Sequence, residues 1–342
     1  MNKIDPLLTK SYDFHLSDEL IATHPANPRD SAKLLVYDRK TDKITHTIFS
    51  DLEKFIPEDC AIIFNDTKVI KARLYGRKAT GGKIEILINR ALNAHDINVY
   101  IRGKVKARMK IFFDKNLIAV VKELKKDGSR IVNFFLNTEP IRFEDLLPII
   151  DEIGHIPLPP YIQREDNKSD ESEYQSVFAK EDGAVAAPTA SLHFTPEQHK
   201  RICDNFTHAY VTLHVGSGTF KPVEEEIITN HPMHSEYYSI SEKAKELLNS
   251  DVEILSVGTT STRTIEFYAR HPQSKGEANL FLHPKNKPKR VNHLLTNFHL
   301  PKSTLFMLVA SFIGIAKTQE LYKEAIKQKY RFYSYGDAML IL

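Results

Sequence analysis

The chain has 342 residues, and 42% of them are hydrophobic, so it is long enough for two domains with sizeable cores and too apolar for a disordered protein. Its 47 basic and 44 acidic side chains leave a net charge of +3, which does not by itself require a nucleic-acid partner. Two cysteines, Cys60 and Cys203, exclude a disulfide framework and a Cys-x-x-Cys metal site. The N-terminus has no signal-peptide pattern, and the longest apolar run is well short of the ~20 residues that cross a bilayer. We therefore expect a cytoplasmic protein without a membrane partner.

The first half of the chain changes character at about residue 70. Residues 61–64 are an apolar run that predicts a buried strand ending at Asn65 and Asp66. Residues 72–150 consist of short strand-like runs separated by turn signals, with almost no helical periodicity. This pattern predicts a small antiparallel β unit, a barrel or a sandwich.

From residue 184 onward, predicted strands alternate with predicted helices. Thr195 is the expected N-cap of a helix with Pro196 at its first position and Gln198 completing a capping box. Strands are expected at residues 209–215, 252–257 and 293–298, and further helices at 259–270, after 303 and at 318–330. The fold class is therefore α/β, a large domain with a mostly parallel sheet. We assign it residues 1–70 and 152–342, with a small antiparallel β-barrel domain, residues 71–151, inserted.

Polar loops follow three of these strands, at residues 214–220, 258–263 and 296–303. Ligands of open parallel sheets bind outside the carboxyl ends of the strands, where glycines allow close approach and hydroxyls donate hydrogen bonds. One shared polar pocket is the prediction, and ordinary turn and capping chemistry is the alternative. The expected ligand-binding residues are Gly216, Gly218, Thr219, Thr259, Thr260, Arg263 and His299.

The Gly216-Ser217-Gly218 sequence is not a dinucleotide fingerprint. Lys221 stands where the third glycine belongs, and Pro222 follows where a helix should begin. Nearby, His231, His234 and Glu236 lack the His-Glu-x-x-His spacing of a metal helix. We expect no metal; an ordinary turn and an acid/base pair remain the two alternatives for these residues.

Cations alternate with apolar or small residues between positions 101 and 111. A strand would place all five cations on one face, where they could neutralise phosphates. The alternative is a solvated edge strand whose charges prevent aggregation. These expected nucleic-acid contacts are Arg102, Lys104, Lys106, Arg108 and Lys110.

Long strings of residues, in order along nearly the whole chain, resemble the S-adenosylmethionine:tRNA ribosyltransferase-isomerase family. They include residues 12–16, 64–69, 154–162, 174–177, 186–194, 212–223, 233–236, 257–263, 296–304 and 330–339. Two departures stand out. Ser191 occupies a position where the family usually has glycine, and residues 282–285 replace a usual aromatic-Pro-Gly turn.

The resemblance implies an α/β domain with an inserted β-barrel, in agreement with the reading of the residues. It also implies transfer and isomerisation of the ribosyl part of S-adenosylmethionine, a co-substrate, onto 7-aminomethyl-7-deazaguanine at the wobble position of tRNA. The products would be epoxyqueuosine in tRNA, adenine and methionine. No prosthetic group and no metal are implied, and we expect a monomer.

Such a reaction needs a base near the sulfonium and groups that hold the acceptor amine and the methionine. His214, at a strand end, is the first choice for the base. Glu236 beside His234 could orient that base or hold the amine, and Asp337 is a further available carboxylate. The methionine carboxylate or the ribose hydroxyls would suit the residues that begin a helix, Thr259, Thr260 and Arg263.

Two rival hypotheses remain. An S-adenosylmethionine-dependent tRNA methyltransferase would share the co-substrate and the RNA, although the usual glycine fingerprint of that fold is missing. A non-catalytic tRNA-binding protein would explain the cations but not the three polar loops. Binding of S-adenosylmethionine by the free protein separates the second rival from both enzymes.

Overall fold

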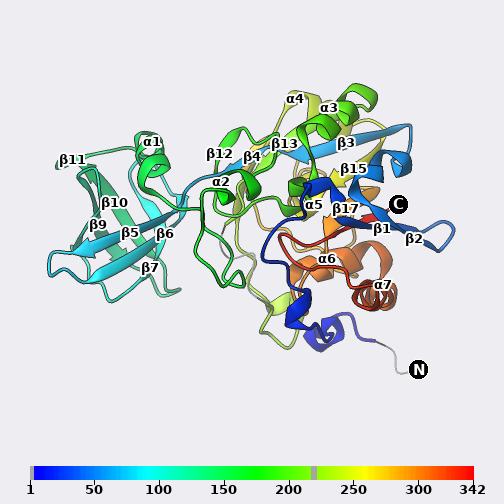
Figure 1. The fold of residues 1–342 in the computed structure, drawn as a ribbon, viewed down its shortest axis with the longest axis horizontal. Coiled ribbons are helices and arrows are strands. Elements are labelled where there is room, and N and C mark those ends of the chain that lie inside the picture. Colours follow the sequence, from blue (N-terminus) through cyan, green and yellow to red (C-terminus); the bar gives the residue numbers. More distant parts are fainter. Residues whose placement is uncertain (1–3, 217–221) are drawn as a thin grey trace. The chain divides into compact units, whose positions relative to one another are not determined.

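The computed structural model describes residues 4–216 and 222–342, and the chain forms two compact units (Figure 1). The sheet unit comprises Met1–Thr67, Gln175–Glu181 and Ala187–Leu342. The barrel unit comprises Lys68–Tyr174 and Asp182–Ala186. The segment 71–151, expected from the sequence to be the inserted domain, lies within the barrel unit, which continues beyond it in both directions.

The sheet unit is built on a nine-stranded sheet with the order β16-β14-β13-β3-β15-β17-β18-β1-β2. Its centre consists of four parallel strands, β13 (His208–Leu213), β3 (Cys60–Asn65), β15 (Glu253–Val257) and β17 (His293–Asn297). The flanking strands are β14 (Glu236–Ile240), β16 (Lys275–Ala278), β18 (Ala338–Ile341), β1 (Lys33–Asp38) and β2 (Lys43–Ile48). The predicted α/β class is confirmed. The whole sheet is mixed. β18 pairs in parallel with β1, whereas antiparallel pairs join β13 to β14, β14 to β16, β17 to β18 and β1 to β2.

The sheet unit contains the four predicted helices, of which the last begins at Ile315 and not at Thr318, and a further helix at Glu242–Leu248 that was not predicted. They are α3 (Pro196–Asn205), α4 (Glu242–Leu248), α5 (Gly258–Tyr268), α6 (Thr304–Ile313) and α7 (Ile315–Lys327). Thr195 caps α3, since its hydroxyl oxygen accepts from the Gln198 amide at 3.1 Å. The Gln198 side chain, however, donates to the Phe49 carbonyl at 3.0 Å, so the second half of the predicted capping box is not formed.

Both faces of the sheet are buried, because successive side chains of a strand point to opposite sides. On β1, Leu35 and Tyr37 enter a core with α6 and α7, while Leu34 and Val36 enter a second core with α3. Figure 1 shows α6 and α7 on one side of the sheet and α3 on the other. This arrangement leaves the ends of the central strands as the place where polar loops can gather.

Among the described residues, no single helix is both long and apolar enough to cross a membrane. Only α6 and α7 taken together have the length and the apolar composition of a membrane span, and the two helices are bent by 113° relative to each other.

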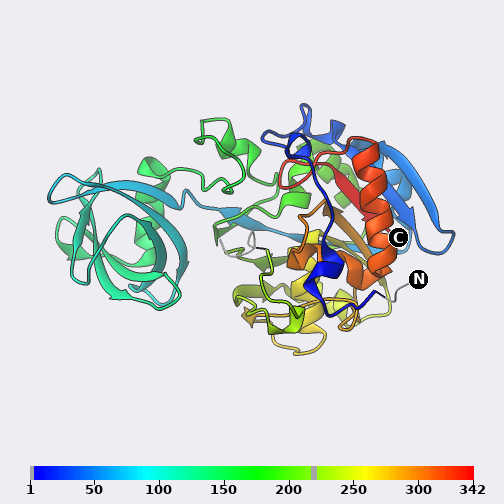
Figure 2. The same ribbon diagram turned by 90° about the horizontal axis from the view of Figure 1, so that it is seen from below.

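In the barrel unit, β10, β7, β6, β5, β8 and β9 pair in that order, and β9 pairs again with β10, which closes the ring (Figure 2). Their bounds are β5 (Arg73–Lys78), β6 (Lys83–Ala91), β7 (Ile97–Arg102), β8 (Lys110–Phe112), β9 (Leu117–Leu124) and β10 (Arg130–Leu136). The barrel unit also contains β11 (Glu139–Pro140), α1 (Phe143–Ile153) and α2 (Asp170–Glu173). Separately, β4 (Thr67–Val69) pairs with β12 (Glu181–Ala184). Leu146 and Ile150 of α1 pack into the barrel core. The predicted antiparallel β-barrel is confirmed.

The expected strand across residues 101–111 is wrong. β7 ends at Arg102 and β8 begins at Lys110, and the backbone between them turns through positive φ values of 123° at Gly103 and 66° at Arg108. Regular strands have negative φ values, so these residues interrupt the expected strand. The apolar residues recur every four positions, not every two, and pack on the barrel core: Ile101, Val105 and Met109. All five predicted cations, Arg102, Lys104, Lys106, Arg108 and Lys110, are exposed, and we call residues 102–110 the basic loop.

Candidate active site

The carboxyl ends of the central strands meet at one edge of the sheet, and Asn65 at the end of β3 joins them. Its amide nitrogen donates to the Leu213 carbonyl at 3.2 Å and lies 3.1 Å from the Thr260 hydroxyl on α5. Its amide oxygen accepts from the Leu213 amide at 3.0 Å. Asn65 is fully buried and therefore fixes the ends of β3 and β13 against the start of α5. Asn65 was expected as a strand end but was not among the predicted site residues.

His214, the predicted base, follows β13 directly. Its Nδ1 lies 2.8 Å from the hydroxyl of Thr67, which was also not among the predicted site residues. Its ring stacks on the ring of Tyr237, with centroids 5.7 Å apart and planes 17° apart. A bond at one ring nitrogen fixes the orientation of an imidazole, which is what a proton-transfer group requires.

Glu236 and Arg263 form a buried ion pair beside His214. The Nη2 of Arg263 lies 2.5 Å from Oε2 of Glu236, and the two residues are 7% and 6% exposed. The other carboxylate oxygen, Oε1, accepts from the Gly216 amide at 3.1 Å. The pair therefore links the first residue of β14 with two of the three predicted polar loops, the one after β13 and the one that begins α5.

The guanidinium of Arg263 also carries a buried donor without a partner. Its Nε is shielded from solvent and has no hydrogen-bond acceptor among residues 4–216 and 222–342. Buried polar groups are normally hydrogen-bonded, so a ligand oxygen would satisfy this donor. A carboxylate is the acceptor that best fits a guanidinium.

The hydroxyl-rich start of α5 serves mainly the helix itself. Gly258 begins the helix with a φ of 90°, and Thr259 and Thr260 are both buried. The hydroxyls of Thr262 and Thr264 donate back to carbonyls four residues earlier, at 3.0 Å in each case. Thr260 is the hydroxyl of this run that bonds to Asn65, at the strand edge.

The structure does not bring two predicted site residues into this cluster. The Nε2 of His299 lies 2.9 Å from the Thr296 hydroxyl, and its backbone amide donates to the Tyr322 hydroxyl of α7 at 3.1 Å. The carboxylate of Asp337 accepts from the backbone amides of Lys33 and Arg331 at 3.0 and 2.7 Å. Both side chains therefore make internal contacts, with partners other than those described above for His214 and Glu236.

The other predicted site residues have simpler positions. Gly216 donates its amide to Glu236, as described above. The side chain of His234 is exposed, two residues before β14. Gly218 and Thr219 lie outside the described residues. In the part of the chain that the structure describes, no group of three His, Cys, Asp or Glu side chains could hold a metal ion.

His299 and a second buried histidine make the stability of the fold sensitive to acid. Burial lowers the pKa of His299 from 6.5 to about 3 and that of His193 to about 4. The unfolded chain binds protons at these imidazoles below pH 6.5 and the folded chain does not, so their contribution is complete above pH 6.5 and is lost as the pH falls toward the folded values.

Lowering the pH from 6.5 to about 4.5 should therefore reduce the free energy of unfolding by roughly 2 kcal/mol for each of the two histidines. Urea unfolding at the two pH values measures this loss. In a His299→Gln variant, the loss should be smaller by about the same amount. An identical loss in the variant and the wild type would show that His299 is not a buried neutral imidazole.

A second basic segment, residues 285–290, follows the unusual turn, and a buried carboxylate holds its backbone. Glu266 of α5 is fully buried, and it accepts from the backbone amides of Lys289, Arg290 and Val291 at 2.7 to 2.8 Å. The guanidinium of Arg290 donates to backbone carbonyls at 2.8 Å, among them that of Leu248. These bonds fix the backbone of residues 289–291, which follow the unusual turn. Within the turn itself, the Asn286 amide donates to the His283 carbonyl at 2.7 Å. At the other departure from the family pattern, the Ser191 hydroxyl is buried and lacks a hydrogen-bond partner in the described part of the chain.

Known proteins resemble this chain along nearly its whole length. A family model described as "Queuosine biosynthesis protein" matches residues 9–341. Similar proteins include an S-adenosylmethionine:tRNA ribosyltransferase-isomerase of Sulfurimonas denitrificans, 74% identical over 337 residues and 98% of each chain. Another, from Nitratiruptor sp., is 60% identical over 339 residues, which cover 99% of this chain and 100% of the relative.

A solved structure supports the same relationship. The S-adenosylmethionine tRNA ribosyltransferase of Thermotoga maritima is 34% identical, with a TM-score of 0.53 and coverage of 97% of this chain and 100% of that chain. The resemblance drawn from the residues is thus confirmed along nearly the whole chain. The family model, the relatives and the solved structure all match over nearly the whole chain. The chain therefore belongs to the queuosine biosynthesis protein family.

Proposed function

We propose that this enzyme transfers and isomerises the ribosyl moiety of S-adenosylmethionine onto 7-aminomethyl-7-deazaguanine at the wobble position of tRNA. The products are epoxyqueuosine in tRNA, adenine and methionine. The observation that carries the proposal is 74% identity over 98% of the chain to a relative with the name S-adenosylmethionine:tRNA ribosyltransferase-isomerase. The cluster of His214, Arg263 and Glu236 at the sheet edge supplies groups that suit this chemistry.

In this proposal, His214 removes the ribose 5′ proton that the neighbouring sulfonium makes acidic. The ribose opens with loss of adenine, the acceptor amine attacks, and closure to the epoxide expels methionine. The buried Nε of Arg263 donates to the methionine carboxylate, while Glu236 holds this guanidinium and the Gly216 amide in place. Roles for the other expected site residues stay predictions: Gly218, Thr219, His234, Thr259, Thr260, His299 and Asp337.

Product analysis tests the proposal directly. The purified protein is incubated with S-adenosylmethionine and tRNA that carries 7-aminomethyl-7-deazaguanine, and the small molecules are identified. Free adenine with methionine is the expected result. S-adenosylhomocysteine would instead establish a methyltransferase, and tRNA binding without any binding of S-adenosylmethionine would establish an RNA-binding protein.

We also propose that the basic loop contacts tRNA phosphates, and that the enzyme is a cytoplasmic monomer. All five cations of the loop are exposed, so they can contact phosphates although the loop is not a strand. Each phosphate that a cation neutralises releases counterions and steepens the salt dependence of binding.

Replacing Lys104, Lys106 and Arg108 by glutamine should weaken tRNA binding and reduce the slope of log K against log salt by about 2. Filter binding between about 50 and 200 mM salt measures that slope. The control removes the exposed lysines Lys54, Lys200 and Lys327 of the sheet unit, which are 71%, 75% and 75% exposed. Equal slopes for wild type and loop variant would overturn the assignment.

A further inference from the structure

The outer face of the barrel carries an exposed aromatic ring. Along β5, the neighbours of Tyr75 are buried in the barrel wall, whereas Tyr75 itself is 49% exposed. In the register of the sheet, Tyr75 pairs with Glu85 of β6, and Glu85 pairs with Arg102 of β7. Two positions further along β5, Arg77 pairs with Lys83. Because side chains alternate between the two faces of a strand, these residues share the outer surface.

A loop after α1 places a second ring beside Tyr75. The backbones of Arg73 and His155 exchange hydrogen bonds of 3.2 and 2.9 Å, which attach the loop to the start of β5. Gly154 permits this close approach, because a Cβ there would lie 2.3 Å from the carbonyl oxygen of Lys71. The imidazole of His155 then meets the Tyr75 ring edge to face, with centroids 4.9 Å apart.

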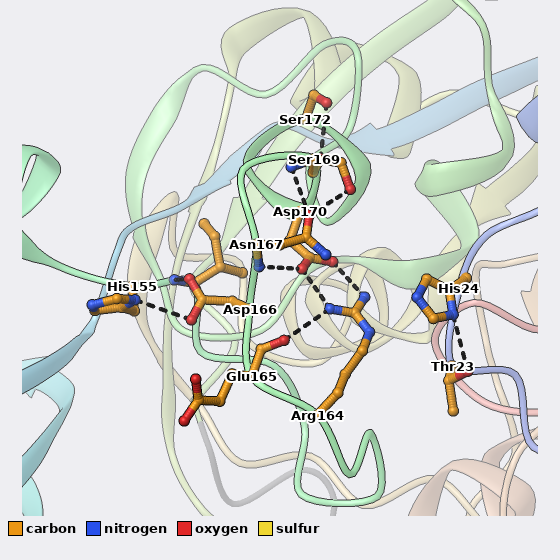
Figure 3. Close-up of polar contacts among 11 residues, drawn as sticks. Thr23, His24, His155, Arg164, Glu165, Asp166, Asn167, Ser169, Asp170 and Ser172 are labelled. Carbon is orange, nitrogen blue, oxygen red and sulfur yellow. Dashed lines mark hydrogen bonds and ion pairs between the residues drawn. The ribbon is translucent and has the colours of Figure 1, made fainter.

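The following residues hold His155 in that position (Figure 3). Asp166 lies 3.1 Å from Nδ1 of His155 and accepts from the Ile156 amide at 3.0 Å. Four residues later, the fully buried Asp170 receives both Nη1 and Nη2 of Arg164, at 2.6 and 2.7 Å. The conspicuous Gly154–Ile162 motif is thus the start of a well-braced loop. Although the loop holds His155 in place, the His155 side chain remains 43% exposed.

Positive charge surrounds these two rings. Arg77 and Lys83 are exposed, and the side chain of Arg102 is 89% exposed at the start of the basic loop. Two carboxylates lie near the rings: Glu85, at 3.3 Å from Arg73 and 3.9 Å from Arg102, and Asp166, at 3.1 Å from His155. Cations therefore exceed carboxylates around Tyr75, and the surface complements a polyanion with aromatic groups.

We propose that this surface, the Tyr75 patch, binds an unpaired nucleotide of the tRNA. The patch is defined by Tyr75, Arg77, Lys83, Arg102 and His155. The base stacks on the Tyr75 ring beside His155, and the flanking phosphates lie on the three cations. Bases inside a helix are already stacked on each other, so an exposed protein ring selects single-stranded loops. The inference rests on the proposed function, which makes tRNA the partner.

Equilibrium binding of two RNA probes tests this inference. One probe is a hairpin with the anticodon stem and loop, and the other is a blunt duplex of the same stem length. Tyr75→Leu should weaken hairpin binding by about tenfold and leave duplex binding unchanged, since it removes the ring but keeps apolar area. Tyr75→Phe should bind both probes like the wild type, and His155→Asn should weaken hairpin binding alone. Leu92→Ala, which truncates another exposed apolar side chain of the barrel unit, is the matched control.

The outcomes separate this inference from the proposed function. If Tyr75→Leu and His155→Asn bind the hairpin as tightly as the wild type, the patch is not a base-binding surface, even where the wild type releases adenine. An equal loss for hairpin and duplex would also overturn it. If the wild type releases no adenine but hairpin binding still depends on Tyr75, the proposed reaction is wrong, whereas the base-binding role of the Tyr75 patch is supported. Thermal melting and S-adenosylmethionine binding confirm that each variant is folded.

Discussion

Replacing Arg263 by methionine is expected to lower the free energy of unfolding by about 3–5 kcal/mol, because it removes the buried guanidinium that pairs with the carboxylate of Glu236. Both side chains are less than a tenth exposed, so water cannot take over the role of the missing partner. Turnover should fall to background in the same variant, since the guanidinium that would hold the methionine carboxylate is gone. Urea unfolding and single-turnover adenine release measure the two effects.

A double variant separates stability from function. Glu236→Leu combined with Arg263→Met removes both charges, and it should recover most of the lost stability, because apolar groups replace a buried ion pair at little cost. Turnover should stay at background. The control is Lys200→Met, which breaks an exposed ion pair with Asp204 and should leave stability nearly unchanged. A single Arg263→Met variant as stable as the wild type would contradict the buried pair.

His214→Ala should reduce turnover by at least ~100-fold if His214 removes the ribose proton. Thr67→Val removes the hydroxyl at 2.8 Å from Nδ1 and should cost about tenfold, since the ring is then less well oriented. S-adenosylmethionine binding should change little in both variants, which places the loss in the chemical step. Single-turnover adenine release and equilibrium binding give the two quantities.

The exposed His271 provides the matched control for this experiment. His271→Ala removes an imidazole from the same unit without touching the cluster, and turnover should remain normal. Near-normal turnover of His214→Ala would exclude His214 as the base. The search would then move to the carboxylate of Glu236.

Much of the fold could be predicted because its signals are local. The apolar run ending at Asn65 and the Thr195 cap depend on a few neighbouring residues, and the structure contains both. The pairing of β1 with β18 could not be predicted in this way, since it joins opposite ends of the chain. In the basic loop, cations alternate with apolar or small residues, a pattern that is typical of a strand. The positive φ values of Gly103 and Arg108, however, belong to the turn between β7 and β8.

The site was predictable only in part, for a related reason. The loops after β13 and β15 were identified as polar strand ends, and the structure joins them through Glu236 and Arg263. That β3 lies between those strands follows from sheet order, which periodicity does not reveal, so Asn65 and Thr67 were missed. His299 shares the composition of a ligand-binding loop but makes internal contacts, because chemistry alone does not tell which way a side chain points.

The closed ring of the barrel unit and the open edges of the large sheet have different consequences for hydrogen exchange. Each strand of the ring has a bonded neighbour on both sides, whereas β2 and β16 end the large sheet with one neighbour each. Amide protons exchange after the bonds that protect them open, and edge strands open in small local steps. In deuterated water, β2 and β16 should therefore exchange early. The ring should retain its protons until the unit unfolds as a whole.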